Sequence, residues 1–516
     1  MFLLVKECRS HAEYQEFLLT HLKKEDPCQL KLYEKVINKA YLLNLDPLRD
    51  YLTGMYASDQ GRPATDPTDM LRSLVVMIEC KVTGITQWAL DLKRNRILTV
   101  ICGFKPAEEE VLPDGKVPPH QVPGVGTFYD FLKRAWLTDQ AELKRRRMQL
   151  RAPLKKPRKK LKAGEKMAPK HPGVIKRLVD RALAGRTFER RPERLIQELF
   201  ARGFVDQSVE KGLIPENLLV SGDGTSVRTG ASSSGVKVCK CREKGIYRCD
   251  CPRRYSDPDA TWGWDSHREE YFFGHTLYEL NACTSQNDLP IYLRLVNASR
   301  HDSVTGVVAL AEARKLFPNL RFGGFVGDSA HDAYDFYRLL NEWELAAFIA
   351  LNGRASGNFN YEPPIKVNEF GIPICPKGYP MAYYGFNKER CRLKWRCPKM
   401  AGKRKHREKV VCEQPCSPSS YGRVVYTKPE WDLRLFTRIP RGTRAWKEVF
   451  NTRTSSERSN KRKKIDYRLE DCRVRSRLQW YWRAHLIAMN QHLDAWVAKE
   501  KPDVLALIFG SEKVAA

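Results

Sequence analysis

Strand-like and helical segments alternate through the second half of the chain, and this alternation constrains the fold most. Apolar runs with the strand period occur in ENLLVSGDGTSV (216–227), in two runs within 271–298, in RFGGFVGDSA and in AAFIALNGR. TGVVALAEARKLFP and AHDAYDFYRLLNEW have helical spacing and lie between the later strands. Strands followed repeatedly by helices predict an α/β fold. One more strand is predicted in LRLFTRIPRGT (433–443), with helices from Trp446 onward.

The remainder of the chain divides by composition. Apolar residues at three- and four-residue spacing predict helices in 68–100, interrupted at Gly84, and in PGVGTFYDFLKRAW. A segment dense in Lys, Arg, Pro and Gly follows, which is typical of a solvated linker and could also contact phosphates. The predicted organisation is a helical N-terminal domain (1–135) that is expected to bind DNA, a basic linker or arm (136–172), a helical connector (173–218), an α/β domain (219–500) with a Cys-rich insertion (about 355–430), and a tail (501–516).

The charge balance points to nucleic acid. The chain carries 90 Lys and Arg against 61 Asp and Glu, a formal net charge of +29. Solubility requires far less charge than this, whereas neutralising phosphates and releasing counterions uses it directly. No stretch has the roughly 18 apolar residues of a membrane span. We therefore expect a cytoplasmic protein with no membrane partner, whose cysteines are thiols or metal ligands.

Three acids stand out as candidate metal ligands. Asp223 and Asp328 each follow an apolar run and have small neighbours, at the strand ends where α/β sheets place their sites. Glu457 is the single carboxylate among six Lys and Arg in FNTRTSSERSNKRKK. Carboxylate oxygens suit Mg²⁺, and paired ions assist phosphodiester chemistry. Each acid alone could equally be a turn former or helix cap, and neighbouring acids compete with two of them: Asp332 with Asp328, and Glu448 or Glu470 with Glu457.

The order and spacing of these acids resemble a known family. Phe450, Arg453, Glu457 and Lys464 have the spacing of the signature that carries the third acid in bacterial insertion-sequence transposases of the DDE type. The aromatic position is usually Tyr, so Phe450 departs from the pattern. The first acid of that family matches Asp223 in Asp-Gly-Thr. The second matches Asp328 in Gly-Asp-Ser, with an aromatic residue at Tyr334.

The resemblance covers about residues 60 to 500 and implies a ribonuclease-H-like catalytic core. It implies that Asp223, Asp328 and Glu457 hold Mg²⁺ or Mn²⁺ for DNA strand cleavage and strand transfer. The implied partners are the element's terminal inverted repeats, target DNA and a second copy of the chain, on the nucleoid of a bacterium or archaeon. Independently, the spacing of Phe450, Arg453, Glu457 and Lys464 predicts one helical face. Charge and the family pattern give Arg453, Lys464, Arg458 and Lys461 as candidate DNA-binding residues.

Two other functions remain open from the sequence. One is a zinc-stabilised DNA-binding regulator whose catalytic core has decayed, although all three acids are present. The other is a metal-dependent nuclease that cleaves DNA without joining the products.

Two groups of cysteines could hold structural zinc, because thiolates in fours at turns suit its closed tetrahedral sites. In the first group, two C-x-C elements are tighter than the usual spacing, and reduced thiols in a small hairpin are the alternative. The second group has one cysteine more than a zinc site needs. The basic run 402–409 beside it could touch DNA or simply be exposed. The first group is Cys239, Cys241, Cys249 and Cys251, and the second is Cys375, Cys391, Cys397, Cys412 and Cys416.

Two further features have structural interpretations. Trp262 and Trp264 alternate in a strand-like segment, where packing within the sheet is favoured over stacking on bases. His301 and Asp302 precede a predicted helix, and we expect them to cap its start.

Overall fold

The computed structural model describes residues 3–107, 121–136, 148–149, 172–189, 191–283, 285–353, 362–401 and 407–510. Most of the predicted linker 136–172, the first half of the basic run 402–409 and residues 511–516 of the predicted tail lie outside the described residues. Among the described residues, no helix is both long and apolar enough to cross a membrane.

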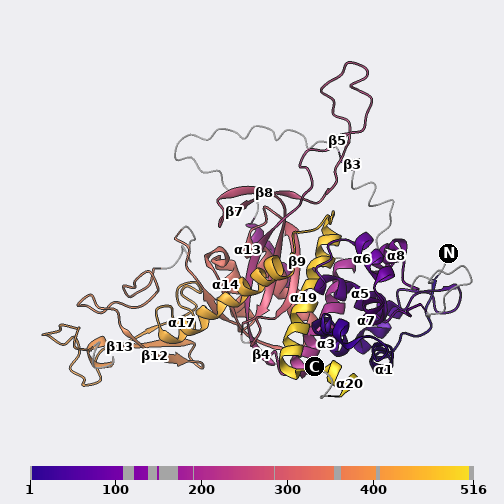
Figure 1. The fold of residues 1–516 in the computed structure, drawn as a ribbon. Coiled ribbons are helices and arrows are strands. Elements are labelled where there is room, and N and C mark those ends of the chain that lie inside the picture. The colour runs from indigo at the N-terminus through magenta and orange to yellow at the C-terminus, as the bar shows by residue number, and fades with distance from the viewer. Residues whose placement is uncertain are drawn as a thin grey trace, which may run out of the picture.

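A six-stranded mixed sheet lies at the centre of the molecule (Figure 1). The strand order is β11-β10-β4-β8-β7, and β9 also pairs with β8. Strands β11, β10 and β4 run parallel, whereas β8 is antiparallel to β4, β9 and β7. The predicted α/β class is therefore confirmed. The strands are β4 (Asn217–Arg228), β7 (Thr261–Asp265), β8 (Glu270–Ala282), β9 (Pro290–Asn297), β10 (Arg321–Gly327) and β11 (Ala346–Ile349).

Helices cover both faces of this sheet. On one face, α13 (Asp302–Leu316) packs on β8 and β9, and its first residue lies against Gly224 of β4. On the other face, α18 (Thr454–Lys461) contacts β4 and β8, and the long α19 (Arg477–Glu500) contacts β9. Because successive strand residues point to opposite faces, adjacent residues of β4 meet different helices. Helix α14 (Tyr334–Glu342) follows β10 and contacts α13 and β11.

The N-terminal helices share one hydrophobic core with the sheet. Buried residues from Tyr14 to Leu505 form a single cluster, and α19 packs against both α3 and α5. Helix α5 begins where Asp66 accepts a hydrogen bond from the Thr68 amide, and the predicted interruption at Gly84 separates it from α6. These helices are α1 (His11–Leu22), α2 (Pro27–Lys31), α3 (Glu34–Leu42), α4 (Arg49–Thr53), α5 (Pro67–Glu79), α6 (Ile85–Arg94), α7 (Arg96–Ile101) and α8 (Val125–Trp136).

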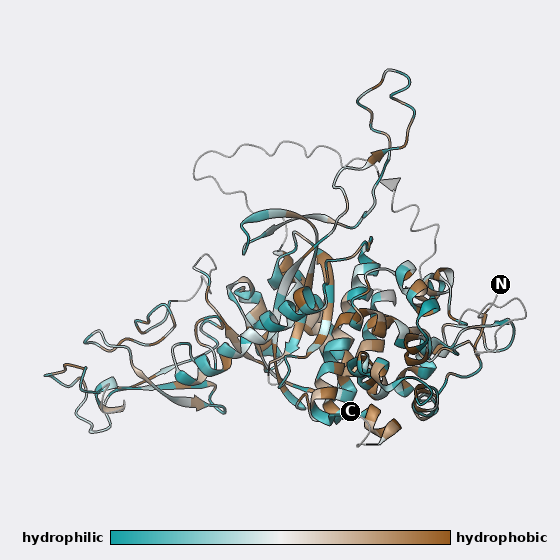
Figure 2. Cartoon of the chain, viewed as in Figure 1, coloured by the Kyte–Doolittle hydropathy of each residue, from teal (hydrophilic) through white to brown (hydrophobic). Residues whose placement is uncertain are grey.

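The segments on either side of the sheet complete the chain. Helices α10 (Val174–Leu183), α11 (Arg191–Phe200) and α12 (Asp206–Glu210) lead into β4, with a π-helical turn (Ala201–Val205) before α12. A short helix, α20 (Val504–Phe509), follows α19 and contacts α3. Hydropathy follows this arrangement, since apolar residues concentrate in the central strands and on inward helix faces (Figure 2).

Two segments project from this body (Figure 1). One is a narrow finger built from β5 (Val236–Lys237) and β6 (Arg253–Arg254), with β3 (Met148–Gln149) paired to β6. The other is the insertion, a three-stranded antiparallel sheet of β12 (Ala382–Asn387), β13 (Arg392–Arg396) and β14 (Val424–Thr427). The insertion has its own small core, which includes Leu393 and Trp395.

The predicted strand at 433–443 is wrong. This segment forms turns, in which Asp432 accepts backbone hydrogen bonds from Arg434 and Leu435. The buried guanidinium of Arg441 holds the turns by donating to the carbonyls of Ile349 and Arg434. Phe436 is buried and Leu433, Leu435 and Ile439 are half-buried against neighbouring segments rather than in a ladder.

The predicted single helix around Glu457 is also corrected. Helix α17 (Arg444–Phe450) passes through a 3₁₀ turn (Asn451–Arg453) into α18, which ends in a π-helical turn (Arg462–Asp466). The π turn brings the adjacent Lys463 and Lys464 both onto the sheet, where they donate to Glu279 and Ser226.

Candidate functional site

Asp223 lies in the middle of β4 rather than at its end. The ladder between β4 and β8 continues through Gly224 to Arg228, so the prediction that the strand ends at Asp223 is wrong. The polar residues after Asp223 extend the strand because β8 supplies backbone partners for them. Asp223 faces Glu279 directly across this ladder, and its Oδ2 accepts a 3.0 Å hydrogen bond from the Asn460 side chain of α18.

Negative charge is concentrated around Asp223. Burial, followed by the nearby carboxylates of Asp302 and Asp328, raises the pKa of Asp223 to about 7. Asp302 comes close because residue 224 is glycine: a Cβ there would lie 2.4 Å from the Asp302 Oδ1. Burial and the charge of Asp328 also raise the pKa of Asp302. Burial and neighbouring carboxylates therefore disfavour the charged forms of both Asp223 and Asp302.

Asp328 follows β10 directly and is held from two sides. Its Oδ1 accepts a 3.0 Å hydrogen bond from the Ala330 amide and lies 2.8 Å from Nδ1 of His331. Nε2 of His331 lies 2.9 Å from the hydroxyl of Tyr278, a buried residue of β8. Burial opposes ionisation of Asp328, but its contacts with His331 and the Ala330 amide and the charge of Arg453 together outweigh burial and lower the pKa of Asp328. The chain Tyr278–His331–Asp328 thus fixes this carboxylate in its charged form.

Glu457 lies on α18 with a half-exposed side chain and forms a 2.8 Å ion pair with Arg453. Its neighbours attach the helix to β4, because the Ser456 and Ser221 hydroxyls are 2.5 Å apart and Asn460 bonds Asp223. Within the described residues, only the first cysteine group brings three or more metal-ligand atoms within 4.8 Å of one another. Asp223, Asp328 and Glu457 therefore do not all lie within that distance of one another.

The competing acids have structural partners. Arg434 binds Asp332 through a buried ion pair at 2.7 Å, which ties the insertion to the segment after β10. Glu448 pairs with Arg444 on the exposed side of α17, and Glu470 accepts from the Arg228 amide. Asp328 acts on Asp223 through its charge, whereas Glu457 is paired with Arg453.

Sequence reasoning missed several residues of this site. Asp302 was interpreted as part of a helix cap, but neither His301 nor Asp302 caps α13 with its side chain, and Asp302 faces the acids. The buried pair of Glu279 and Lys463 lies beside Asp223. An acid at an inward position of an alternating strand was the available signal for Glu279. Nothing in the sequence pattern indicated the contact of Tyr278 with His331.

The predicted DNA-binding residues take up different positions. Lys464 extends toward β4, 3.1 Å from the Ser226 hydroxyl, and burial lowers its pKa. Arg458 makes two 2.6 Å hydrogen bonds to Asp288, whereas Lys461 is exposed at the end of α18. Arg453 stands between Glu457 and the region of Asp328, whose pKa it helps to lower. Phe450 stacks on Trp446, with 4.5 Å between ring centroids.

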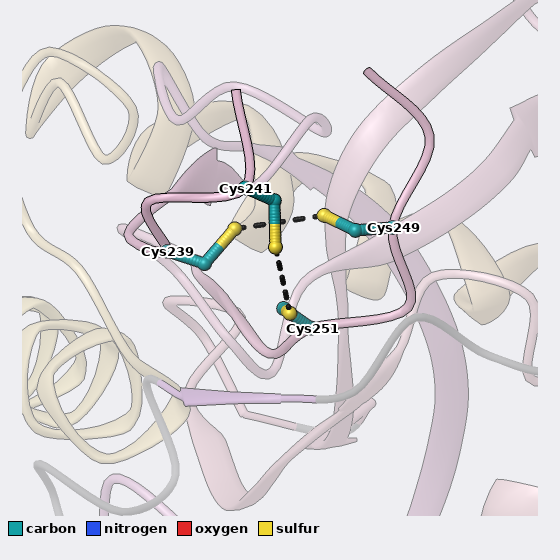
Figure 3. A group of neighbouring side chains, drawn as sticks. All are labelled: Cys239, Cys241, Cys249 and Cys251. Atoms are coloured by element: carbon teal, nitrogen blue, oxygen red, sulfur yellow. Dashed lines mark hydrogen bonds between the residues drawn. The ribbon is translucent and has the colours of Figure 1, made fainter. Parts of the chain in front are cut away.

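The first cysteine group forms a compact thiol cluster in the finger (Figure 3). The sulfurs of Cys239 and Cys249 are 3.5 Å apart, as are those of Cys241 and Cys251. A tetrahedral zinc with Zn–S bonds of about 2.3 Å requires sulfurs about 3.8 Å apart. Hydrogen bonds from the Cys241 amide and the Cys249 thiol lower the pKa of Cys239 to about 7. This group could hold a metal such as zinc.

The tryptophans of β7 pack against the neighbouring strand, as the sequence favoured, although both remain exposed to solvent. Trp262 is 55% exposed and Trp264 is 53% exposed. Each contacts one aromatic ring of β8, Phe273 and Tyr271 respectively. They lie on β7, the strand at one edge of the sheet.

No protein-family model matches this chain, and a search of curated proteins finds no relative.

Proposed function

We propose that this protein is a DDE-type transposase, an enzyme that cleaves DNA phosphodiesters and joins the freed 3′-hydroxyl to target DNA. The observation that carries the proposal is the approach of Asp223, Asp328 and the Glu457 helix to one another. They belong to β4, the end of β10 and α18, and more than 100 residues separate each from the next. Hydrogen bonds from α18 to β4 and the mutual influence of Asp223 and Asp328 support their acting together.

The sheet order supports a ribonuclease-H-like core. Without the short β7, the order is β9-β8-β4-β10-β11, with the first acid in the first core strand and the second acid directly after the fourth. The family resemblance implies this arrangement of acids.

The acids fit a divalent cation by their chemistry. Asp223 is buried among carboxylates that raise its pKa, and added positive charge would relieve that repulsion. Hard oxygen ligands favour Mg²⁺ or Mn²⁺. When bound, such ions activate a water or 3′-hydroxyl and stabilise the leaving oxygen. His331 keeps Asp328 ionised and oriented, and Asn460 orients Asp223.

The cations of α18 and the following turn suit phosphate contacts. Lys461 is exposed, and Lys464 lies beside Ser226, three residues beyond Asp223. Arg453 would leave Glu457 when the acid binds metal and would then face the DNA backbone. With a net charge of +29, the chain favours DNA electrostatically. The proposed partners are the element's terminal repeats, target DNA and a second copy of the chain, on the nucleoid.

One observation favours a second function, a DNA-binding regulator without catalysis. Glu457 is paired with Arg453, and the three acids do not close to ligand distance. In a decayed enzyme this ion pair would be permanent.

The test is cleavage and joining of DNA carrying the gene's flanking ends, with Mg²⁺. It compares wild type, Asp328→Ala and the control variant Asp59→Ala, which replaces an exposed acid distant in sequence from the three candidate acids. A transposase nicks the ends and joins them to target in wild type and control, while Asp328→Ala binds without cutting. Binding without cutting by all three proteins supports the regulator. Cutting by wild type without joined products supports the nuclease.

A further inference from the structure

The second cysteine group divides into four residues and one. Cys375, Cys397, Cys412 and Cys416 line a single small cavity, together with Lys377, Lys399 and Arg423. Cys391 lies in the turn between β12 and β13 and does not line this cavity, although it is exposed like Cys416. We propose that these four cysteines bind a structural zinc ion, separate from the thiol cluster of the finger.

The backbone presents these thiols from turns. The Gly378 amide donates to the Cys375 carbonyl at 2.8 Å, with Gly378 at φ +83°, and the Cys375 amide donates to Tyr379. Cys397 directly follows β13, and its carbonyl accepts a hydrogen bond from the Met400 amide. Short turns of this kind suit closed zinc sites, to which separate segments contribute thiols. Among these four described cysteines, no three sulfurs lie within 4.8 Å of one another, so zinc would draw the turns closer together.

The surroundings suit a negatively charged metal centre. Zinc with four thiolates carries two negative charges, and three cationic side chains line the same cavity. The insertion also needs a stabilising cross-link, because its core is small. Among the described residues, this core has five buried members: Met381, Leu393, Trp395, Val425 and Phe436. A metal would join the turn before β12, the end of β13 and the loop before β14.

The test is the zinc content of the full-length protein purified without chelator. Two zinc ions per chain are expected in wild type and in Cys391→Ser, and one in Cys412→Ser and in the finger variant Cys249→Ser. One zinc in wild type, or equal loss in Cys391→Ser and Cys412→Ser, would overturn the proposal.

A second measurement does not depend on how the variants fold. Alkylation of native wild-type protein, mapped by mass spectrometry, should modify Cys391 and spare the other four until zinc is chelated. Modification of all five at equal rates before chelation contradicts the site.

A different observation concerns the opposite face of the insertion sheet. On β13, Leu393 and Trp395 point into the core, while Arg392, Lys394 and Arg396 alternate with them on the other face. Three tyrosine rings lie beneath these cations. The guanidinium of Arg396 is 3.2 Å from the Tyr421 ring centroid and 4.7 Å from that of Tyr384, and Arg392 is 3.8 Å from that of Tyr426.

We infer that this face, which we call the tyrosine–cation face, binds the DNA backbone. Lys394 also lies over two of the rings and 3.2 Å from the Tyr421 hydroxyl, so the face holds a row of oriented cations. Guanidinium groups held on aromatic rings lose less freedom on binding phosphate. The inference rests on DNA being the partner in the proposed function. An acidic peptide is the other ligand class that such a face accepts.

The test is fluorescence anisotropy of a labelled DNA duplex across a salt series, with the full-length protein. Replacing Lys394 and Arg396 by Gln should weaken binding about tenfold and reduce the log–log salt slope by about 2, because two phosphate contacts are lost. Lys428→Gln, a cation of the same insertion paired with Glu430, should change neither.

The outcomes separate the two proposals. If wild type does not bind DNA, the proposed function fails. If wild type binds and the double variant matches it in affinity and slope, with unchanged zinc content, only the tyrosine–cation face is wrong.

Discussion

Asp223 and Glu279 face each other directly across the ladder between β4 and β8, yet only Glu279 has a cation of its own. Lys463 binds Glu279 from the π-helical turn, and both side chains are fully buried. Asp223 has the amide of Asn460 and further acids around it. Two opposed carboxylates thus have distinct roles, one neutralised within the fold and one open to an external cation.

Replacing Asp223 by Asn should stabilise the metal-free protein at high pH. The pKa of Asp223 is raised to about 7, so the wild type loses stability as pH rises from about 4 through 7, while the variant does not. The gain is bounded at about 4 kcal/mol, since a tenfold change in dissociation is worth about 1.4 kcal/mol. Thermal unfolding at pH 5 and pH 8 measures it, with Asp59→Asn as control. If the stability difference between Asp223→Asn and wild type does not grow from pH 5 to pH 8, the raised pKa of Asp223 is wrong.

Gly224→Ala should disturb the site although alanine is small. The new Cβ would lie 2.4 Å from Oδ1 of Asp302, which must move away from Asp223. We expect a loss of about 1–3 kcal/mol in unfolding free energy, as for other overpacked positions. Gly230→Ala is the matched control just beyond β4, where the nearest atom is 3.6 Å away. Equal effects in chemical denaturation would show that contact with Asp302 is unimportant.

Lys463→Met should be among the most damaging single changes. It leaves the buried carboxylate of Glu279 without its cation, which typically costs about 3–5 kcal/mol. Adding Glu279→Gln removes the stranded charge and should restore most of the stability. Urea denaturation of wild type, both single variants and the double variant gives the coupling free energy between Lys463 and Glu279. Additive losses would mean that the two residues act independently.

Tyr278→Phe should weaken the support of Asp328. The change removes the hydroxyl 2.9 Å from Nε2 of His331 and leaves that buried nitrogen unpaired, a cost of about 1–3 kcal/mol. Tyr426→Phe, on the insertion, is the control. Denaturation midpoints measure both, and an unchanged Tyr278→Phe protein would rule out this hydrogen bond as a support.

Removing metal from the finger should unfold the finger alone. Its residues are largely exposed and carry many Lys and Arg, so little besides the thiol cluster holds it. In zinc-containing buffer, limited trypsin digestion should cut the Cys249→Ser variant between residues 237 and 254. The same segment should stay intact in wild type and in the control variant Cys28→Ser, which replaces an exposed cysteine outside the finger. Resistance of Cys249→Ser to trypsin would show that the finger does not need a metal.

The sequence predicted which helices and strands form better than it predicted the residues at which they begin and end. Apolar periodicity gave the strands of the sheet and the helices after them, because burial dictates that pattern. It failed at Asp223, where polar residues continue the strand through backbone pairing to β8, and at 433–443, where buried Arg434 and Arg441 hold turns. Contacts between distant segments, such as Lys463 with Glu279 and Tyr278 with His331, leave no local pattern.

The pairing of Lys463 with Glu279 also has a consequence for synthesis. The lysine follows the glutamate by 184 residues, so the nascent sheet leaves the ribosome with an unneutralised acid on its inner face. At about 5–20 residues per second, that state lasts roughly 10 to 40 seconds. A chain cut short before residue 463 could not close this face. The ribosome must therefore nearly finish the protein before the acids of the site acquire their final surroundings.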